Sequence, residues 1–196
     1  MTLILASGSA ARRHMLEAAG IIFEVMSPAV DEEAAKAQLR AQGLAPREQA
    51  LALAEQKALS VARARAGYVI GADQMLALGD EAFDKPANAA EARAHLLRLR
   101  GRTHELITAA VVARGGEILW RAVDTPALTM RMFSEDFLDT YVARAGDRVL
   151  HSVGAYQLEG LGAQLFEAVE GDYFSVLGLP LLPLLAFLRE QGIAQT

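Results

Sequence analysis

The sequence contains no cysteine among its 196 residues, which excludes disulfides, thiolate zinc sites and cysteine nucleophiles. Aromatic residues are also few, at 6%, and basic charge is not in excess, because 19 Lys and Arg face 24 Asp and Glu for a net charge of −5. Both features disfavour a nucleic-acid-binding protein, so any anion site must be local. What the chain does have is 53% hydrophobic residues, enough to bury a substantial core.

Long hydrophobic runs are missing as well. The most apolar stretch, 176–188, is shorter than the roughly 20 residues that a membrane span needs and contains Pro180 and Pro183, so it predicts a buried helix. The first residues show no basic region followed by a long apolar core and a small-residue cleavage site. We therefore expect a cytoplasmic location and no membrane partner.

Several common catalytic motifs are absent too. The sequence has no G-x-x-x-x-G-K-[ST] loop, no G-x-G-x-x-G after a strand, no H-E-x-x-H and no G-x-S-x-G. Its four histidines show no metal-ligand spacing. These absences disfavour a P-loop NTPase, a dinucleotide-binding enzyme, a zinc protease and an α/β-hydrolase.

The pattern of apolar residues predicts a mixture of strands and helices. Strands are expected over 2–6, 21–30, 68–78 and, as two long strands of a hairpin around Gly115 and Gly116, within 104–133. Helices are expected over 11–20, 46–66, 88–101 and 135–146, and a further strand and a last helix within 153–191. Because the hairpin breaks a strict alternation, we expect a mixed α/β fold, and residues 1–196 as a single domain.

The stretch LASGSAARRHML, residues 5–16, places two arginines where a strand gives way to a helix. Gly8 lets the backbone turn, the helix start offers unpaired N–H groups, and Arg12 and Arg13 add full positive charges. Ser9 and Arg12 are three residues apart and can therefore face the same anion. This pattern suits a phosphate, and it equally suits a serine N-cap followed by solvated arginines.

Four further charged residues lie at the margins of apolar elements: Glu32, Lys57, Asp73 and Lys85. Each has an ordinary interpretation, as a solvated acidic residue, a snorkelling lysine, a turn aspartate and an exposed lysine before a proline. Taken together they form the mixture that hydrolysis of a phosphoanhydride requires. Carboxylates hold a divalent cation and orient water, and cations balance the charge of the phosphates.

The assembled segments resemble the Maf family of nucleoside triphosphate pyrophosphatases. The segments that carry the resemblance, nearly from end to end, are LASGSAARR, VDE, LALAEQKA, IGADQ, DKP, LRGRTHELITA, VGAYQLEG and EGDYFSVLGLPL. The resemblance implies a mixed sheet with flanking helices and two lobes around a cleft, similar to the fold of inosine triphosphate pyrophosphatases. It also implies cleavage between the α- and β-phosphates of a nucleotide with Mg²⁺ or Mn²⁺, giving a monophosphate and pyrophosphate.

The resemblance assigns roles by position. Ser9 and Arg12 match the S-x-x-R phosphate grip of the family. The usual Pro-Arg after the second serine is here Ala10-Ala11, so one customary cation is displaced to Arg13 or missing.

The other charged residues also match positions of the family. Lys57 matches the helical lysine that binds substrate, and Lys85 the catalytic lysine of the K-P motif. Glu32 and Asp73 match the acidic residues expected to hold the metal. Asp73 is then the general base or the metal-bound group that orients the attacking water.

Two positions bear on the substrate. Gln74 and Glu159 depart from the subgroup that acts on dTTP and UTP, and both resemble the 7-methyl-GTP subgroup. The carboxylate of Glu159 can accept two guanine N–H donors. A dTTP/UTP pyrophosphatase, a nucleotide-binding regulator of cell division with incidental turnover, and an interaction protein with a dimer face are the alternatives, and the sequence leaves a homodimer open.

Overall fold

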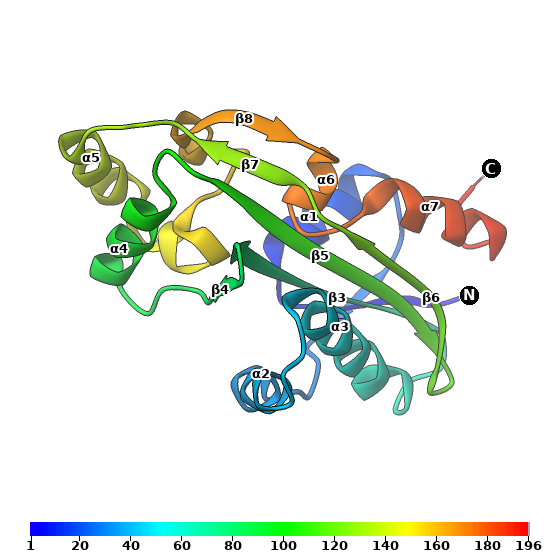
Figure 1. Cartoon of the computed structure of the whole chain (residues 1–196). Helices are drawn as coiled ribbons and strands as arrows, with labels where there is room; N and C mark the ends of the chain where they lie inside the picture. The colour runs from blue at the N-terminus through cyan, green and yellow to red at the C-terminus, as the bar shows by residue number, and fades with distance from the viewer. Residues whose placement is uncertain (196) are drawn as a thin grey trace. The chain divides into compact units, whose positions relative to one another are not determined.

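The computed structural model describes residues 1–195 and has a mixed α/β fold with one eight-stranded sheet (Figure 1). The strands are β1 (Leu3–Ala6), β2 (Glu24–Met26), β3 (Tyr68–Leu78), β4 (Glu81–Phe83), β5 (Thr103–Arg114), β6 (Glu117–Asp124), β7 (Ala127–Met130) and β8 (Phe166–Glu170). The α-helices are α1 (Ala10–Ala18), α2 (Glu32–Ala41), α3 (Pro46–Ala62), α4 (Ala89–Leu99), α5 (Glu135–Ala145), α6 (Tyr173–Val176) and α7 (Leu181–Glu190). The predicted fold class is confirmed.

The sheet is mixed because its strands pair in both senses. Its hydrogen-bonded order is β2-β1-β3-β5-β7-β8, with β4 paired to β3 and β6 to β5. Strand β1 is parallel to β2 and β3, whereas the β3–β4, β5–β6, β5–β7 and β7–β8 pairs are antiparallel.

The predicted hairpin around Gly115 and Gly116 is confirmed as β5 and β6. Its second strand is shorter than predicted, because β6 ends at Asp124 and a separate strand, β7, begins after Pro126. Proline has no N–H to donate to a sheet and so favours such a break. Strand β7 then pairs with the beginning of β5, near Thr103, rather than with its end.

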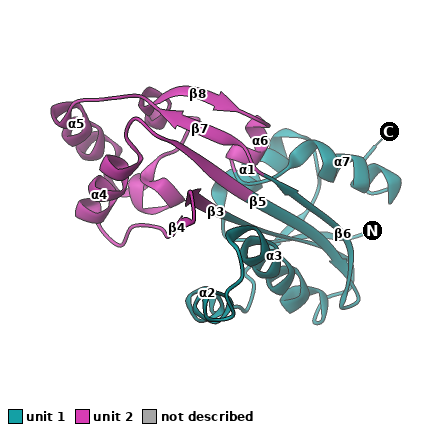
Figure 2. Ribbon diagram, viewed as in Figure 1, with its two compact units in different colours: residues 1–74, 108–124, 178–196 teal, residues 75–107, 125–177 magenta. Residues whose placement is uncertain are grey.

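The chain divides into two compact units, coloured separately in Figure 2. Unit 1 comprises residues 1–74, 108–124 and 178–196, and unit 2 comprises residues 75–107 and 125–177. Strands β3 and β5 each contribute residues to both.

Within unit 1, helix α3 packs closely on β3 at Gly71. A Cβ atom at Gly71 would lie 2.3 Å from the carbonyl oxygen of Ala54 and 2.6 Å from the backbone nitrogen of Ala58. Real side chains do not tolerate such contacts, so glycine is required for this approach. Lys57 lies between these two α3 residues and Asp73 lies two positions beyond Gly71, so the same packing brings their side chains together.

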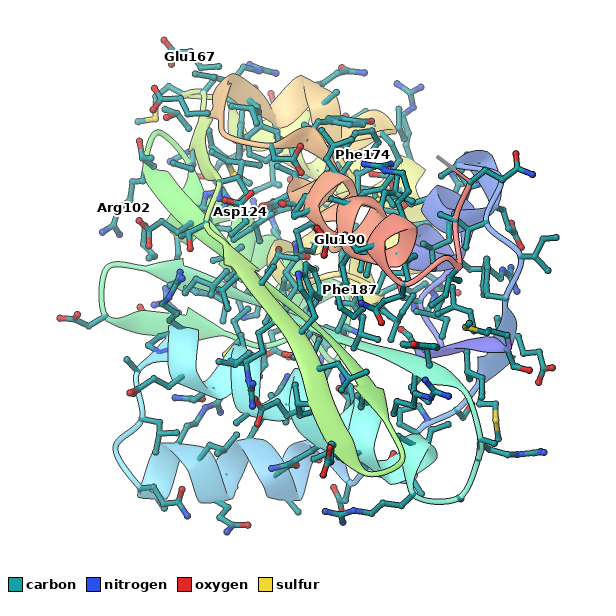
Figure 3. The ribbon with its side chains drawn as sticks, turned by 90° about the vertical axis from the view of Figure 1, so that its right-hand side faces the viewer. Arg102, Asp124, Glu167, Phe174, Phe187 and Glu190 are labelled. Carbon is teal, nitrogen blue, oxygen red and sulfur yellow. The ribbon has the colours of Figure 1, made fainter. Side chains whose placement is uncertain are left out.

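The C-terminal helix α7 also belongs to unit 1. Its Phe187, labelled in Figure 3, is buried and stacks on Trp120 of β6 with ring centroids 5.7 Å apart. The predicted helix over 176–188 is therefore correct from Leu181 onward but starts too early, because Gly178 and Pro180 separate α6 from α7. Among the described residues, no helix combines the length and apolarity that crossing a bilayer requires.

Unit 2 has its own core. It is formed around fully buried side chains from α4, β5 and β7, among them Leu96, Leu106 and Leu128. Both of its long helices have side-chain N-caps, since Asn88 accepts a hydrogen bond from the N–H of Glu91 in α4 and Ser134 accepts one from the N–H of Phe137 in α5. Between α5 and β8 the backbone forms the short 3₁₀ helices η1 (Gly146–Leu150), η2 (Val153–Ala155) and η3 (Leu161–Leu165).

Two elements differ from the sequence prediction in the segment after α1. The strand predicted over 21–30 is only β2, residues 24–26, and α2 was not predicted at all. The N-cap of α2 is Asp31, whose side chain accepts a hydrogen bond from the N–H of Ala34. Only Leu39 of this helix is buried, and its signals in the sequence, an aspartate cap, an acidic first turn and Gly43 beyond its last turn, were overlooked.

Candidate active site

The centre of the candidate site is a buried ion pair between Lys57 and Asp73 in unit 1. The Lys57 Nζ atom lies 2.7 Å from Oδ1 of Asp73, and the side chains are only 6% and 7% exposed. Glu32, at the first position of α2, places its Oε2 atom 3.0 Å from the same Nζ. The structure thus brings together three of the predicted site residues, and Lys57 is buried between carboxylates rather than solvated.

The second carboxylate oxygen of Asp73 is in a different state. Oδ2 is buried and has no hydrogen-bond partner among residues 1–195. A buried carboxylate oxygen left without a partner is costly, by roughly 1–3 kcal/mol or more, so it indicates a ligand or a water at this position. Asp73 is therefore held through Oδ1, whereas Oδ2 has no protein partner among the described residues.

The donor set fits a divalent cation that is shared with a substrate. No group of three or more His, Asp or Glu side chains within the described part of the chain can hold a metal alone. Mg²⁺, however, is commonly bound by one or two carboxylates together with substrate phosphates. Glu32 and Asp73 supply that number of carboxylates.

Arg12 has partners that the sequence interpretation did not foresee. Its Nε donates to the carbonyl oxygen of Gly178 at 2.7 Å, and its Nη1 donates to the carbonyl oxygen of Ala72 at 3.0 Å and to Ser7 Oγ at 3.3 Å. The residue is 9% exposed. Burial lowers the pKa of Arg12 from its usual value, and the charges of Asp73 and Glu32 oppose that shift.

The start of α1 keeps the features of an anion site. Ser9 is its N-cap and accepts a hydrogen bond from the N–H of Arg12 at 3.3 Å, so the capping interpretation of this serine is correct. Arg13, next in the chain, has a side chain that is 55% exposed, with its Nε 3.7 Å from Glu17. Of the two adjacent arginines, Arg13 is therefore the one whose charge reaches solvent.

Gln74 follows the catalytic candidate Asp73 on β3 and is half-buried. Its Nε2 atom donates to Oγ1 of Thr108 at 2.8 Å, and Thr108 on β5 is completely buried. This bond fixes which end of the Gln74 amide faces β5. Thr108 was not predicted, and neither were Ser7 and Gly178 as partners of Arg12, although a threonine inside the apolar run of β5 is a detectable signal.

The remaining two predicted site residues belong to unit 2. Lys85 is exposed and lies two residues after the end of β4, before Pro86. Glu159 is exposed in the turn between η2 and η3. Each is accessible to a ligand.

Known proteins match this sequence along almost the whole chain. The profile of one protein family, described as "Maf-like protein", matches residues 2–191. The chain is 54% identical to a "Nucleoside triphosphate pyrophosphatase" of Hyphomonas neptunium, over 100% of this chain and 99% of the relative. It is 56% identical to a protein of the same name from Paramagnetospirillum magneticum, over 96% and 98%. A "7-methyl-GTP pyrophosphatase" of Mesorhizobium japonicum is 53% identical over 97% and 96%.

Proposed function

Since the chain belongs to the Maf family and is an enzyme that hydrolyses phosphoanhydride bonds, we propose that it cleaves nucleoside triphosphates between the α- and β-phosphates. The products are a nucleoside monophosphate and pyrophosphate. The observation that supports this reaction most directly is the Asp73 carboxylate, buried, with Oδ1 held by Lys57 and Oδ2 lacking a hydrogen bond among the described residues.

Asp73 is the residue that prepares water for attack. In this proposal its Oδ2 atom accepts a hydrogen bond from a water molecule and takes the proton as the water oxygen bonds to the α-phosphorus. The bond from that phosphorus to the bridging oxygen breaks, and pyrophosphate leaves with the electron pair. Lys57 prevents the carboxylate from rotating, because its ammonium holds Oδ1 at 2.7 Å.

The phosphates bind where positive charge and N–H donors meet. The first turn of α1 offers its N–H groups, the hydroxyl of Ser9 and the exposed Arg13, and we assign Lys85 to the leaving pyrophosphate. In the alternative role of Asp73, Glu32 and Asp73 would hold Mg²⁺ or Mn²⁺, which when bound would neutralise phosphate charge and orient the attacking water.

We propose 7-methyl-GTP as the preferred nucleotide. The support is the name of the Mesorhizobium relative and the chemistry of Gln74 and Glu159. A carboxylate at position 159 accepts the N1–H and N2–H donors of guanine, whereas uracil offers carbonyl oxygens on both sides of its single N–H. Methylation at N7 gives the base a positive charge, which a carboxylate favours.

A substrate panel tests the reaction and the preference together. Pyrophosphate release from 7-methyl-GTP, GTP, dTTP and UTP would be measured with the purified full chain and Mg²⁺. We expect pyrophosphate rather than orthophosphate as the first product, loss of turnover in excess chelator, and the highest kcat/KM for 7-methyl-GTP. Orthophosphate as the first product, or full turnover in chelator, contradicts the reaction, and a higher kcat/KM for dTTP or UTP favours the pyrimidine alternative.

The contribution of Glu159 is tested by Glu159→Gln in the same panel. Because Glu159 is exposed, water competes for its hydrogen bonds, and we expect the ratio of kcat/KM between 7-methyl-GTP and UTP to fall only about three- to tenfold. Glu167→Gln, an exposed change in β8, serves as the matched control. An unchanged ratio in Glu159→Gln removes this residue from the recognition of the base.

A further inference from the structure

Arg12 joins three segments of unit 1 that are far apart in the sequence. Its guanidinium bonds to Ser7 just after β1, to Ala72 of β3 and to Gly178 between α6 and α7. The Ala72 and Gly178 partners are 60 and 166 residues away along the chain. Bonds of this kind add no local helix stability, because they fix the ends of separate elements against one another.

The bond to Ala72 is the one closest to the chemistry. Ala72 directly precedes Asp73, so a hydrogen bond to its carbonyl oxygen, at 3.0 Å, fixes the peptide from which the Asp73 side chain projects. Lys57 holds the same residue from the other side through Oδ1. The backbone and the carboxylate of Asp73 are thus each held by one cation.

The loop at Gly178 is shaped to meet the arginine. Gly178 has φ +104°, a conformation that side-chain-bearing residues rarely adopt, and a Cβ atom there would lie 3.4 Å from Arg12 Nε. Its carbonyl oxygen accepts from that Nε at 2.7 Å. A planar guanidinium presents its donors to these acceptors from separate nitrogens in a fixed fork, whereas a lysine carries its three donors on one rotating nitrogen.

We propose that Arg12 is a positioning residue that fixes Asp73 through the Ala72 peptide, and that Arg13 rather than Arg12 supplies the arginine contact to the phosphates. This inference rests on the proposed function of Asp73. It separates the two adjacent arginines by their surroundings: one is buried against protein oxygens, and the other is more than half exposed. The three bonds use Nε and Nη1 of Arg12 and leave Nη2 out. The alternative hypothesis is therefore that Arg12 binds a phosphate directly through Nη2.

The test compares Arg12→Lys with wild type in the full chain. It measures kcat and KM for 7-methyl-GTP and the dissociation constant of inorganic tripolyphosphate, determined by calorimetry without turnover. We expect kcat to fall about ten- to a hundredfold, as misplacement of a catalytic group does, with KM and the tripolyphosphate constant changed less than about threefold. Weaker tripolyphosphate binding at unchanged kcat would show a phosphate ligand instead and overturn the inference.

A double-mutant cycle separates positioning of Asp73 from a general loss of structure. If Arg12 acts through Asp73, the variant carrying both Arg12→Lys and Asp73→Asn is no slower than Asp73→Asn alone, within about threefold. Multiplying effects overturn the inference while leaving the proposed function intact. A full rate in Asp73→Asn overturns the proposed function and this inference with it.

Ser7→Ala provides a milder variant in case Arg12→Lys does not fold. The Ser7 side chain is buried, and its Oγ accepts from Arg12 Nη1 at 3.3 Å and from the N–H of Ser9 at 3.2 Å, so Ser7→Ala removes both bonds. We expect kcat to fall several-fold with the tripolyphosphate constant unchanged. An unchanged kcat, or a weakened tripolyphosphate constant, counts against the positioning role.

Discussion

At the scale of single residues, the two oxygens of Asp73 have opposite surroundings. Oδ1 is 2.7 Å from the Lys57 ammonium, and Oδ2 is buried without a partner among the described residues. Asp73→Asn keeps the shape and removes the charge that accepts a proton or binds a cation. We expect kcat to fall about 10²–10⁴-fold while the fold persists, measured by pyrophosphate release and circular dichroism. A loss below about tenfold would assign Asp73 a capping role only.

Lys57 gives a second prediction at this scale, because it is the buried counter-ion of Asp73. Lys57→Met retains the volume of the stem but leaves the buried carboxylate without its closest cation. Breaking one partner of a buried pair costs about 3–5 kcal/mol, and we expect a decrease of that order in the free energy of unfolding in urea at pH 7.5.

The double variant Lys57→Met/Asp73→Asn is the control for this prediction. It removes both charges, so it should recover part of the lost stability while remaining inactive. Additive losses of stability in the two single variants would show that the pair is not energetically coupled.

How far the site could be predicted depends on what each residue contacts. Glu32, Lys57 and Asp73 were all identified from the sequence, because each carries charge at the margin of an apolar element, and the structure brings them together. The partners of Arg12 could not be predicted, since two are backbone carbonyls, which no residue type reveals. The guanidinium reaches these carbonyls only once three segments that are distant in the sequence have packed together.

At the scale of elements, the site depends on how closely α3 approaches β3. Gly71→Ala would place a Cβ 2.3 Å from a backbone oxygen of α3, and backbone cannot move aside as a flexible side chain can. We expect a loss of about 1–3 kcal/mol or more in the free energy of unfolding and a parallel loss of kcat, because α3 carries Lys57.

Gly8→Ala is the matched control for the stability measurement. A Cβ at Gly8 would meet nothing within 4 Å, so its free energy of unfolding should change by less than about 0.5 kcal/mol. Equal stability of the two variants would mean that the approach at Gly71 is not tight in solution.

The same elements show why sequence patterns predict some structure well and some poorly. Strand β3 matches its predicted bounds, 68–78, because a continuous apolar run bounded by turn residues is buried on both faces. Helix α2 was missed although Asp31 and Gly43 mark its two ends, and β7 was merged with β6 although Pro126 lies between them. The apolar pattern reports burial, whereas the ends of these elements are marked by caps and breaks that it does not show.

At the scale of the whole molecule, the local charges of the site differ from what the net charge of the chain suggests. The chain is acidic, with a net charge of −5, yet the described site places Lys57 and Arg12 in the interior, each beside Asp73 or its peptide. Such cations are held in place by specific acceptors and not by a general basic field. We therefore expect the site to select a polyphosphate by its geometry rather than through a general attraction for polyanions such as nucleic acids.

The acid stability of the molecule should depend on a histidine outside the proposed chemistry. His104 is 1% exposed, with its Nε2 atom 2.7 Å from the hydroxyl of Tyr156. Burial lowers the pKa of His104 from 6.5 to about 4 in the folded protein, because the charged ring loses its hydration. Between these two values the unfolded chain binds a proton that the folded chain does not.

The sign of the resulting pH dependence follows from that difference. The contribution of His104 is complete above pH 6.5, decreases as the pH falls, and levels off below about 4. At about 1.4 kcal/mol per pH unit, the full loss is roughly 3 kcal/mol. His104→Gln cannot titrate, so its free energy of unfolding, measured in urea at steps from pH 7.5 to 4, should decline less steeply than that of wild type by this amount. His151→Gln, a change at an exposed histidine, should keep the wild-type slope. Parallel curves for His104→Gln and wild type would show that folding does not change the pKa of His104.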